Sequence, residues 1–500
     1  MLAGVLLACS RPGPDIGWLA LVALVPLFVA WRGVGARRGA WLGFVTGAIY
    51  NGIVLSWAWY FGAVAIVPFV AWVALYPAIV GAVIGALDRR GVRHPLLTAA
   101  VWVVGEGLLA RWPLGGFSWG EVGYAFHDIA AMRSLGALGG LGLISFVAVA
   151  INDAIATALV ERSSGRVRIG LIVPVLGLAA LTIGWHAVSP TPTTTGELRY
   201  ALLQGNDVNR HLTDDEFFGS PATGFENLLV YNHFELAASL EGEYDLIVFP
   251  ESSFPDAPNA PDPVDFPLAR WPEQLGDVAR AHNSYVLANG AGDAPDGRAR
   301  NLNVLWSPEG EIIGEYAKRH LVPFGEWVPW RSTIERFVDA IDQIPRDFAP
   351  GTSPGRFEIR GTPIATIICF ESMFGAEVRP LVRDGAELIV VSTNNRSYRR
   401  SSNSEQHLAA AQIRAVETGR PVLQASVSGI TGVVEADGRV IATQPLFENG
   451  VVSGTIATRG GMTPYVRFGD WVLWGSAAGA GLALVFVVVR RRSVDSPADE

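Results

Sequence analysis

The sequence predicts a bundle of about eight transmembrane α-helices joined to a separate α/β domain outside the cytoplasm. Half of the 500 residues are apolar and only 17% are charged, which is too apolar a composition for an ordinary soluble protein. Residues 191–470 hold 37 acidic and 23 basic residues, whereas the remainder holds 10 and 15. An acidic domain therefore interrupts a basic, apolar frame, and no basic patch indicates nucleic-acid binding.

Apolar runs fill the first 189 residues and recur once near the C-terminus. Most approach the roughly 17–25 residues that a bilayer requires, whereas the opening run Leu2 to Ala8 is too short to span unaided. We therefore expect N-terminal transmembrane helices (1–189), an extracytoplasmic domain (190–470), a last transmembrane helix (471–489) and a cytoplasmic tail (490–500). The expected spans lie near residues 16–31, 39–61, 64–87, 95–110, 137–160, 169–188 and 471–489.

Arginine placement predicts the orientation of these spans. Twelve arginines of the apolar frame fall in alternate loops and the tail, and three fall in the intervening loops. Because basic residues favour the cytoplasmic side, the tail is expected inside and the 190–470 domain outside. The twelve are Arg32, Arg37, Arg38, Arg89, Arg90, Arg93, Arg162, Arg166, Arg168 and Arg490 to Arg492, and the three are Arg11, Arg111 and Arg133.

Some residues inside the expected spans are small or ionisable. Glycine pairs at four-residue spacing favour close helix packing. Glu106 and Asp153 also fall inside spans, where ionisable groups often serve a function but can equally cap a helix or face a partner. The sequence assigns a role to neither carboxylate. The glycine pairs are Gly43/Gly47, Gly81/Gly85, Gly136/Gly140 and Gly475/Gly479.

Short β-rich runs alternate with helical stretches in the 190–470 segment, which predicts an α/β domain. Glu405–Thr418 has apolar residues at helical spacing, and Gly419 is expected to end that helix. Residues 422–442 have the pattern of a hairpin that turns at Asp437-Gly438. The expected strands are 198–203, 246–249, 285–288, 364–368 and 388–392.

Three expected strand ends present residues suited to nucleophilic acyl chemistry. Glu251 follows a strand in YDLIVFPESS, Lys318 lies in GEYAKRHLVPFGEWVP, and Cys369 follows a strand in IATIICFESMF. Glu251 can act as general base for the thiol. Lys318, the single lysine among 38 basic residues, can stabilise an oxyanion together with the backbone N–H of Phe370. These residues predict a Glu251, Lys318, Cys369 triad.

Each triad residue also has an ordinary structural interpretation. A glutamate after a strand is usually solvated, a cysteine in a buried strand usually packs as a small hydrophobe, and a lone lysine is usually at the surface. The joint occurrence of all three favours the triad. Cys9 and Cys369 form no CxxC pair, so we expect neither a disulfide framework nor a metal site, and no cofactor. GFSWG at 116–120 fits a hydrolase elbow, but no strand precedes it, so Ser118 is not expected to be a nucleophile.

The motifs resemble the nitrilase superfamily, whose members use a Glu-Lys-Cys triad on an αββα sandwich. Nearly the whole chain is similar to the apolipoprotein N-acyltransferase family, the membrane-bound branch of that superfamily. The characteristic stretches are GFSWGEVGY (116–124), LLQGN (202–206), FPES (249–252), KRHLVPFGEWVP (318–329), ICFESMF (368–374) and HLAAAQIRAVETGRPVLQASVSG (407–429).

The resemblance implies the last step of lipoprotein maturation. An acyl chain would move from a membrane phospholipid to Cys369 as a thioester, and then to the free α-amine of a diacylglyceryl-cysteine on an apolipoprotein. Glu326 and Glu371 would be supporting carboxylates. Two alternatives stay open. One is a membrane-anchored amidase or other hydrolase that uses the same triad with water as acceptor, and the other is a non-catalytic membrane scaffold.

The chain departs from the family pattern in three places. Ser118 stands for a proline in a GFPW-type loop, and Phe370 stands where tyrosine is common. The 394–404 loop replaces an Asn-Asp-x-Trp-Phe-type loop with a polar, arginine-rich sequence. Arginine clusters suit phosphate and aromatic-basic mixtures suit membrane interfaces, which predicts a lid that touches donor head groups, with an ordinary solvated loop as the alternative. Its relevant residues are Arg396, Tyr398, Arg399 and Arg400.

Overall fold

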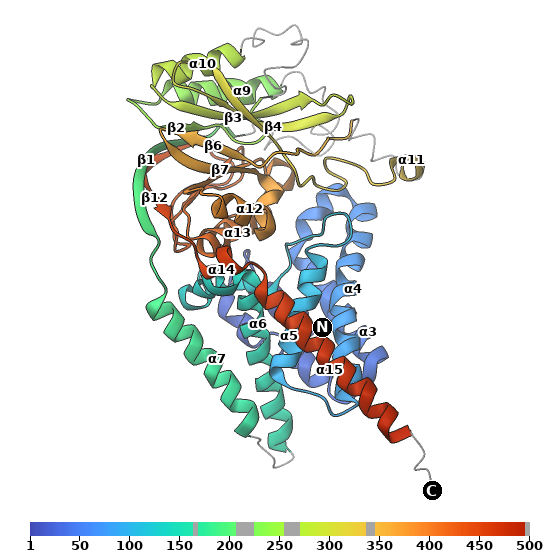
Figure 1. The fold of residues 1–500 in the computed structure, drawn as a ribbon. Helices are drawn as coiled ribbons and strands as arrows, with labels where there is room; N and C mark the ends of the chain where they lie inside the picture. The colour runs from blue at the N-terminus through green and yellow to red at the C-terminus, as the bar shows by residue number, and fades with distance from the viewer. Residues whose placement is uncertain (164–168, 207–224, 255–270, 337–345, 496–500) are drawn as a thin grey trace. The chain divides into compact units, whose positions relative to one another are not determined.

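The computed structural model, drawn as a ribbon in Figure 1, describes residues 1–163, 169–206, 225–254, 271–336 and 346–495. The chain forms two compact units. The first, called the helical unit below, comprises Met1–Pro190, Ser401–Ala409 and Thr463–Glu500. The second, called the sandwich unit, comprises Thr191–Arg400 and Ala410–Met462.

The helical unit contains helices at each expected span. Two of them, α4 and residues Ala130–Glu161 of α6, are long and apolar enough to cross a membrane. The described helices are α1 (Leu2–Cys9), η1 (Gly17–Leu21), α2 (Val25–Ala30), α3 (Gly35–Val54), η2 (Ser56–Phe61), α4 (Ala63–Asp88), α5 (Pro95–Leu109), η3 (Val122–Phe126), α6 (Ala130–Ser163), α7 (Ile169–Val188), α14 (Pro464–Phe468) and α15 (Trp471–Asp495).

The described residues do not confirm a bundle of eight full-length spans. The expected span 16–31 is divided into η1 and α2, and Pro26 lies in the first turn of α2, where a proline needs no backbone donor. The expected span 39–61 is divided at Leu55 into α3 and η2. The other apolar helical stretches, at Gly17–Ala30, Pro95–Leu109, Leu176–Val188 and Trp471–Val487, are only 10–17 residues long.

Glycines allow α3 and α4 to pack backbone against backbone. A Cβ atom at Gly39 would lie 2.2 Å from the Gly81 carbonyl oxygen, and one at Gly43 would lie 2.1 Å from the Pro77 carbonyl oxygen. A Cβ atom at Gly85 would lie 2.5 Å from the Gly35 carbonyl oxygen, in the first turn of α3. A Cβ atom at Gly47 would lie 2.8 Å from the Pro77 ring. The pairs Gly43/Gly47 and Gly81/Gly85 are therefore confirmed as packing positions, since a side chain at any of them would collide with the facing helix.

The C-terminal glycine pair does not behave in this way. A Cβ atom at Gly475 or Gly479 would have no described heavy atom within 4 Å. In α6 the backbone of Gly139 and Gly140 departs from helical angles, and Gly140 has φ +70°. A Cβ atom at Gly140 would lie 2.5 Å from the Tyr465 ring, so glycine permits both the kink and this contact.

Buried charges of the helical unit bind specific partners. Arg11, 1% exposed, donates to the carbonyl oxygens of Trp119 (2.8 Å) and Glu121 (3.0 Å). It thus ties the end of α1 to the 116–124 loop. Asp153 pairs with Arg93 at 2.5 Å, which gives this carboxylate a structural partner. Arg11 is therefore a buried charge held by backbone carbonyls.

Two six-stranded sheets form the sandwich unit. Their orders are β12-β1-β2-β3-β4-β5 and β11-β10-β9-β8-β7-β6. The strands are β1 (Thr193–Gln204), β2 (Leu246–Val248), β3 (Tyr285–Asp293), β4 (Ala299–Trp306), β5 (Ile312–Ala317), β6 (Arg356–Ile359), β7 (Thr362–Ile368), β8 (Leu388–Thr393), β9 (Val422–Ser426), β10 (Thr431–Val434), β11 (Val440–Gln444) and β12 (Gly450–Gly460). The helical segments are α9 (Phe225–Ala238), α10 (Trp271–Ala281), α11 (Arg331–Ile334), η6 (Cys369–Met373), α12 (Gly375–Arg383), η7 (Arg396–Tyr398) and, from Ala410 onward, α13 (Asn403–Thr418).

Alternating residues of one strand show how the layers form. Leu198, Tyr200 and Leu202 of β1 pack in the core between the two sheets. Ala201 and Leu203 point the other way, into the core that β1 shares with α9 and α10. Figure 1 shows α9 and α10 outside the first sheet and α12 beside the second. The result is an αββα sandwich, as the resemblance implied.

The predicted elements of this unit are found. All five expected strands exist, the expected helix corresponds to α13, and β10 pairs antiparallel with β11 in the expected hairpin. Four strands were not predicted: β4, β5, β6 and β12.

Candidate active site

The nucleophile candidate occupies a sharp corner. Cys369 directly follows β7, which is paired in parallel with β8, and has φ +50°. A non-glycine residue in the left-handed region is unusual and marks a backbone held by its surroundings. The corner turns the chain out of the buried strand and into η6, and Cys369 as a residue is partly buried there.

Lys318 lies between two carboxylates. Its Nζ atom is 3.4 Å from Glu251 Oε1 and 2.9 Å from Glu326 Oε1, and the lysine side chain is 1% exposed. Burial by itself lowers the pKa of Lys318, but Glu326 and Glu251 outweigh it and hold the pKa well above the ordinary value. The ammonium therefore stays charged. The structure brings together Glu251, Lys318 and the supporting candidate Glu326.

Asn301 of β4 connects the two carboxylates and was missed by sequence reasoning. Its Nδ2 donates to Glu251 Oε1 at 2.8 Å and to Glu326 Oε1 at 3.0 Å. Its Oδ1 accepts from Asn289 at 2.8 Å, and Asn289 also donates to Asn303 at 3.0 Å. These buried amides fix the carboxylate orientations. A usable signal existed: ARNLNVLW places Asn301 and Asn303 on one face of a largely apolar strand.

The remaining contacts place the thiol in the same electrostatic site. Burial and the neighbouring Glu251 raise the pKa of Cys369 to about 12, while Lys318 and a hydrogen bond with Thr393 act in the opposite direction. Glu251 Oε2 accepts from the backbone N–H of Asn394 at 3.0 Å. The resting thiol is therefore protonated, with a buried carboxylate and a buried ammonium as charged neighbours. This arrangement can perform base-assisted thiol chemistry.

Family models match two parts of the chain. The N-terminal domain of apolipoprotein N-acyltransferase matches residues 3–154, and carbon-nitrogen hydrolase matches residues 226–463. An apolipoprotein N-acyltransferase of Geobacter metallireducens is 30% identical, over 99% of this chain and 95% of that protein. The chain belongs to the apolipoprotein N-acyltransferase family. The relative of Methylococcus capsulatus is also 30% identical, over 99% of this chain and 96% of that protein. The relative of Photobacterium profundum is 28% identical, over 95% of this chain and 91% of that protein.

In this member of the apolipoprotein N-acyltransferase family, Glu371 braces the backbone around the site. Its Oε1 accepts from the N–H groups of Arg319 (2.8 Å) and His320 (3.1 Å), and its Oε2 accepts from Ile368 N–H (2.8 Å). Tyr316 OH donates to it as well. Glu371 is fully buried and does not contact Lys318 through a hydrogen bond among the described residues. It therefore links the segment after Lys318 to the strand that ends just before Cys369.

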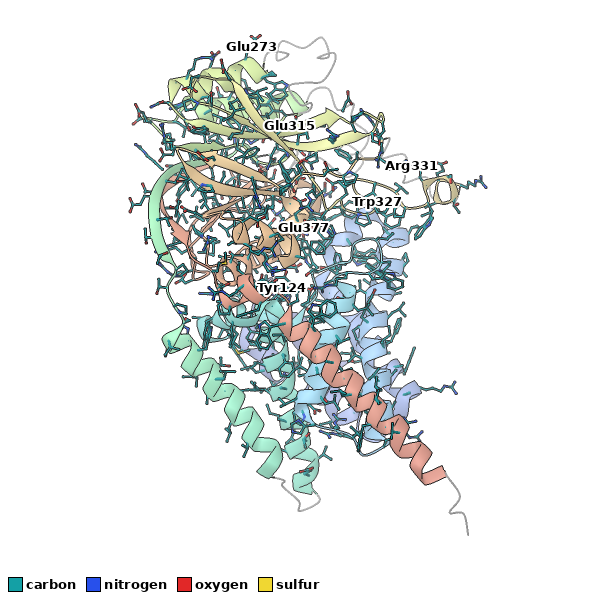
Figure 2. All side chains as sticks on the ribbon, in the orientation of Figure 1. Tyr124, Glu273, Glu315, Trp327, Arg331 and Glu377 are labelled. Atoms are coloured by element: carbon teal, nitrogen blue, oxygen red, sulfur yellow. The ribbon has the colours of Figure 1, made fainter. Side chains whose placement is uncertain are left out.

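Phe370 belongs to an aromatic cluster beside the corner. Its ring meets Phe374 edge-on at 4.9 Å and His320 at 5.6 Å, and His320 stacks on Phe374 at 3.9 Å. His320 also lies 3.7 Å from Glu377, which Figure 2 labels on α12. The Phe370 side chain is thus a packing group, so the expected oxyanion donor is its backbone N–H rather than its side chain.

The 394–404 loop is connected to the site at its first residue. Asn394 donates to Glu251, and Asn395 and Arg399 have φ +55° and +47°. Arg400 lies over the Phe447 ring at 5.4 Å. Burial and the nearby Cys369 raise the pKa of Tyr398. The loop is therefore structured around the triad, while its action as a lid stays a prediction.

Two other clusters lie in the helical unit. Asp15, His127 and Asp128 place ligand atoms within 4.8 Å of one another. Both ring nitrogens of His127 face carboxylates, at 3.0 and 3.4 Å; burial lowers its pKa, but these carboxylates outweigh it and raise the pKa to about 9. This is the geometry of a protonated histidine rather than of a neutral metal ligand. Ser118 donates to Glu121 Oε1 at 2.5 Å, a carboxylate partner in the loop rather than a catalytic dyad with histidine.

Proposed function

We propose that this chain transfers an acyl chain from a membrane phospholipid to the N-terminal amine of the diacylglyceryl-cysteine of apolipoproteins, through a thioester on Cys369. The observation that carries the proposal is the pairing of buried Lys318 with Glu251 in the electrostatic surroundings of Cys369. Family membership supports the acceptor and the reaction class.

The first half-reaction forms the acyl-enzyme. Glu251 takes the thiol proton as the Cys369 sulfur attacks the ester carbonyl of the phospholipid. Lys318 and the N–H of Phe370 stabilise the negative charge that develops on the carbonyl oxygen. The carbon–oxygen bond of the ester then breaks, and Glu251 returns the proton to the departing lysophospholipid alkoxide.

The second half-reaction consumes the thioester. The free α-amine of the acceptor attacks the thioester carbonyl while Glu251 accepts a proton from the nitrogen. The carbon–sulfur bond breaks, an amide forms, and the thiol is restored with that proton. Glu326 and Asn301 are positioning residues in this scheme, because they contact Lys318 and Glu251 rather than the reacting carbonyl.

Location follows from the donor and the acceptor. We place the 190–470 domain outside the cytoplasm, between the N-terminal helices (1–189) and the last transmembrane helix (471–489), in a multi-pass protein of the cell membrane. The arginine distribution and two helices long enough to span a membrane support this placement.

The competing functions differ in what receives the acyl group. Purified protein would be incubated with phospholipid, with and without a diacylglyceryl-cysteinyl peptide. We expect lysophospholipid to accumulate to one equivalent without peptide, and acylated peptide to form with it. Continuous release of fatty acid without peptide would indicate a hydrolase, and no reaction in either case would indicate a scaffold.

A further inference from the structure

A cavity of about 50 Å³ lies inside the helical unit, among α1, α3, α4, α5 and the 116–124 loop. Tyr50, Asn51, Glu106 and Glu121 bring polar groups to its wall. The reaction proposed above uses none of these residues. Glu106 is one of the two span carboxylates to which the sequence assigned no role, and the cavity is where that carboxylate lies.

Two buried oxygen atoms at this cavity lack a hydrogen-bond donor among the described residues. Asn51 is 2% exposed, and its Nδ2 donates to Gly47 at 2.9 Å, but its Oδ1 has no such partner. Glu121 is 5% exposed and receives the Ser118 hydroxyl on Oε1, but its Oε2 has no such partner. Leaving buried acceptors unpaired costs free energy. These two atoms therefore indicate a ligand that is either a cation or a hydrogen-bond donor.

Neighbouring donors are already used. Tyr50 OH donates to the Gly120 carbonyl at 2.9 Å, and Tyr76 OH donates to the Trp112 carbonyl. Glu106 Oε1 accepts from Trp102 Nε1 at 2.9 Å and from Val122 N–H at 2.8 Å. The polar groups of the cavity therefore offer oxygen lone pairs, and these tyrosine hydroxyls have no further proton for an anion.

The charges select among possible ligands. The electrostatic neighbours at this site are Arg11, Glu106 and Glu121, and Arg11 directs its guanidinium at backbone carbonyls instead of at either carboxylate. With both carboxylates ionised, the two carboxylates and the one guanidinium have a formal charge of −1. A divalent cation would give the site a net positive charge, and a water molecule would leave its negative charge uncompensated. A monovalent cation would neutralise it.

We propose that this cavity binds a monovalent alkali cation, Na⁺, through Asn51 Oδ1 and the carboxylates of Glu121 and Glu106. Hard cations take oxygen ligands, and ionisable groups inside membrane helices commonly mark ion sites. The site would join α3, α5 and the 116–124 loop, so the cation would stabilise the helical unit. The inference does not depend on the proposed acyl transfer.

Thermal unfolding of the full-length protein in detergent tests the proposal, with tryptophan fluorescence as the readout. NaCl would be titrated against choline chloride at constant ionic strength, because choline is too large for this cavity. We expect a saturable, Na⁺-specific rise in Tm of roughly 2–4 °C. Equal Tm values in the two salts would overturn the proposal, and this comparison needs no variant.

Variants locate the effect. Glu121→Gln keeps the shape of the side chain but removes its charge, and Asn51→Leu removes the amide oxygen. Both should lose the Na⁺-specific rise. Glu161→Gln makes the same charge change in α6, away from the cavity lining, and should retain it. Persistence of the rise in folded Glu121→Gln protein would show that Na⁺ binds elsewhere and would contradict the assignment.

Discussion

Single residues determine the chemistry of the site, and the role of Asn301 can be tested with one substitution. Asn301→Leu removes the amide that donates to both Glu251 and Glu326. Hydrogen bonds to charged groups contribute about 1.5–3 kcal/mol. We therefore expect acyl-enzyme formation to slow by roughly 10- to 100-fold, measured by single-turnover kinetics. Asn449→Leu, at an exposed position of the same unit, should keep the wild-type rate; equal rates in both variants would count against the positioning role.

The thiol's ionisation gives a second residue-scale prediction. Burial and Glu251 raise the pKa of Cys369 to about 12, and Lys318 lowers it. Below that pKa the thiolate fraction rises about tenfold per pH unit, so alkylation should accelerate as pH increases. At pH 9, Glu251→Gln should speed iodoacetamide labelling and Lys318→Gln should slow it, in a Cys9→Ser background that leaves one thiol. Changes in the same direction in both variants would refute the electrostatic account.

At the residue scale, the sequence could predict groups whose identity is unusual but not the groups that orient them. A single lysine and a cysteine after a strand can be recognised from residue type and position alone. Asn301 acts through its strand pairing, since β4 brings it opposite Ala291 and beside Asn289, and Glu371 acts by contacting three backbone N–H groups from two segments. These contacts depend on strand register and on long-range folding. The two asparagines on one face of β4 could therefore mark a polar position, but not its partners.

Among the elements, the α3–α4 pair depends most directly on particular residues. Gly43→Ala would place a methyl group 2.1 Å from the Pro77 carbonyl oxygen, so the helices must separate. Overpacking of this kind costs about 1–3 kcal/mol. We expect a lower Tm for full-length Gly43→Ala protein by thermal unfolding in detergent. Gly479→Ala is the matched control, because its Cβ meets no described heavy atom within 4 Å; an equal loss in both would contradict the packing account.

Helices and strands with strong local sequence patterns could be predicted. Strands that depend on pairing with a distant strand could not. The α13 helix and the β10–β11 hairpin have clear periodicity and turn residues. By contrast, β12 carries Gly450, Gly454 and Gly460 and is defined by antiparallel pairing with β1. Pairing of that kind overrides a weak intrinsic preference. In the apolar frame, hydropathy located the helices but could not detect the break at Leu55.

At the scale of the whole molecule, the arginine distribution predicts which side of the membrane each part occupies. Twelve of fifteen frame arginines fall on one predicted side. An alkaline phosphatase fusion after Ser189 should be active and one at the C-terminus inactive, because that enzyme matures only outside the cytoplasm. Activity from the C-terminal fusion alone would reverse the topology. Arg11, one of the three exceptions, binds backbone carbonyls of the 116–124 loop, so a structural role accounts for this arginine.

The central claim is that Cys369 carries the acyl group, and intact-protein mass spectrometry after incubation with phospholipid measures this directly. Wild-type protein should gain one acyl mass, mapped to Cys369, in the absence of acceptor. Cys369→Ala should gain none and Cys369→Ser almost none, because a serine hydroxyl ionises far less readily. Lys318→Arg should fail because the guanidinium fork does not fit a point-charge site, and Glu251→Gln because proton removal is lost. An adduct on another residue, or an acylated Cys369→Ala protein, would contradict the account.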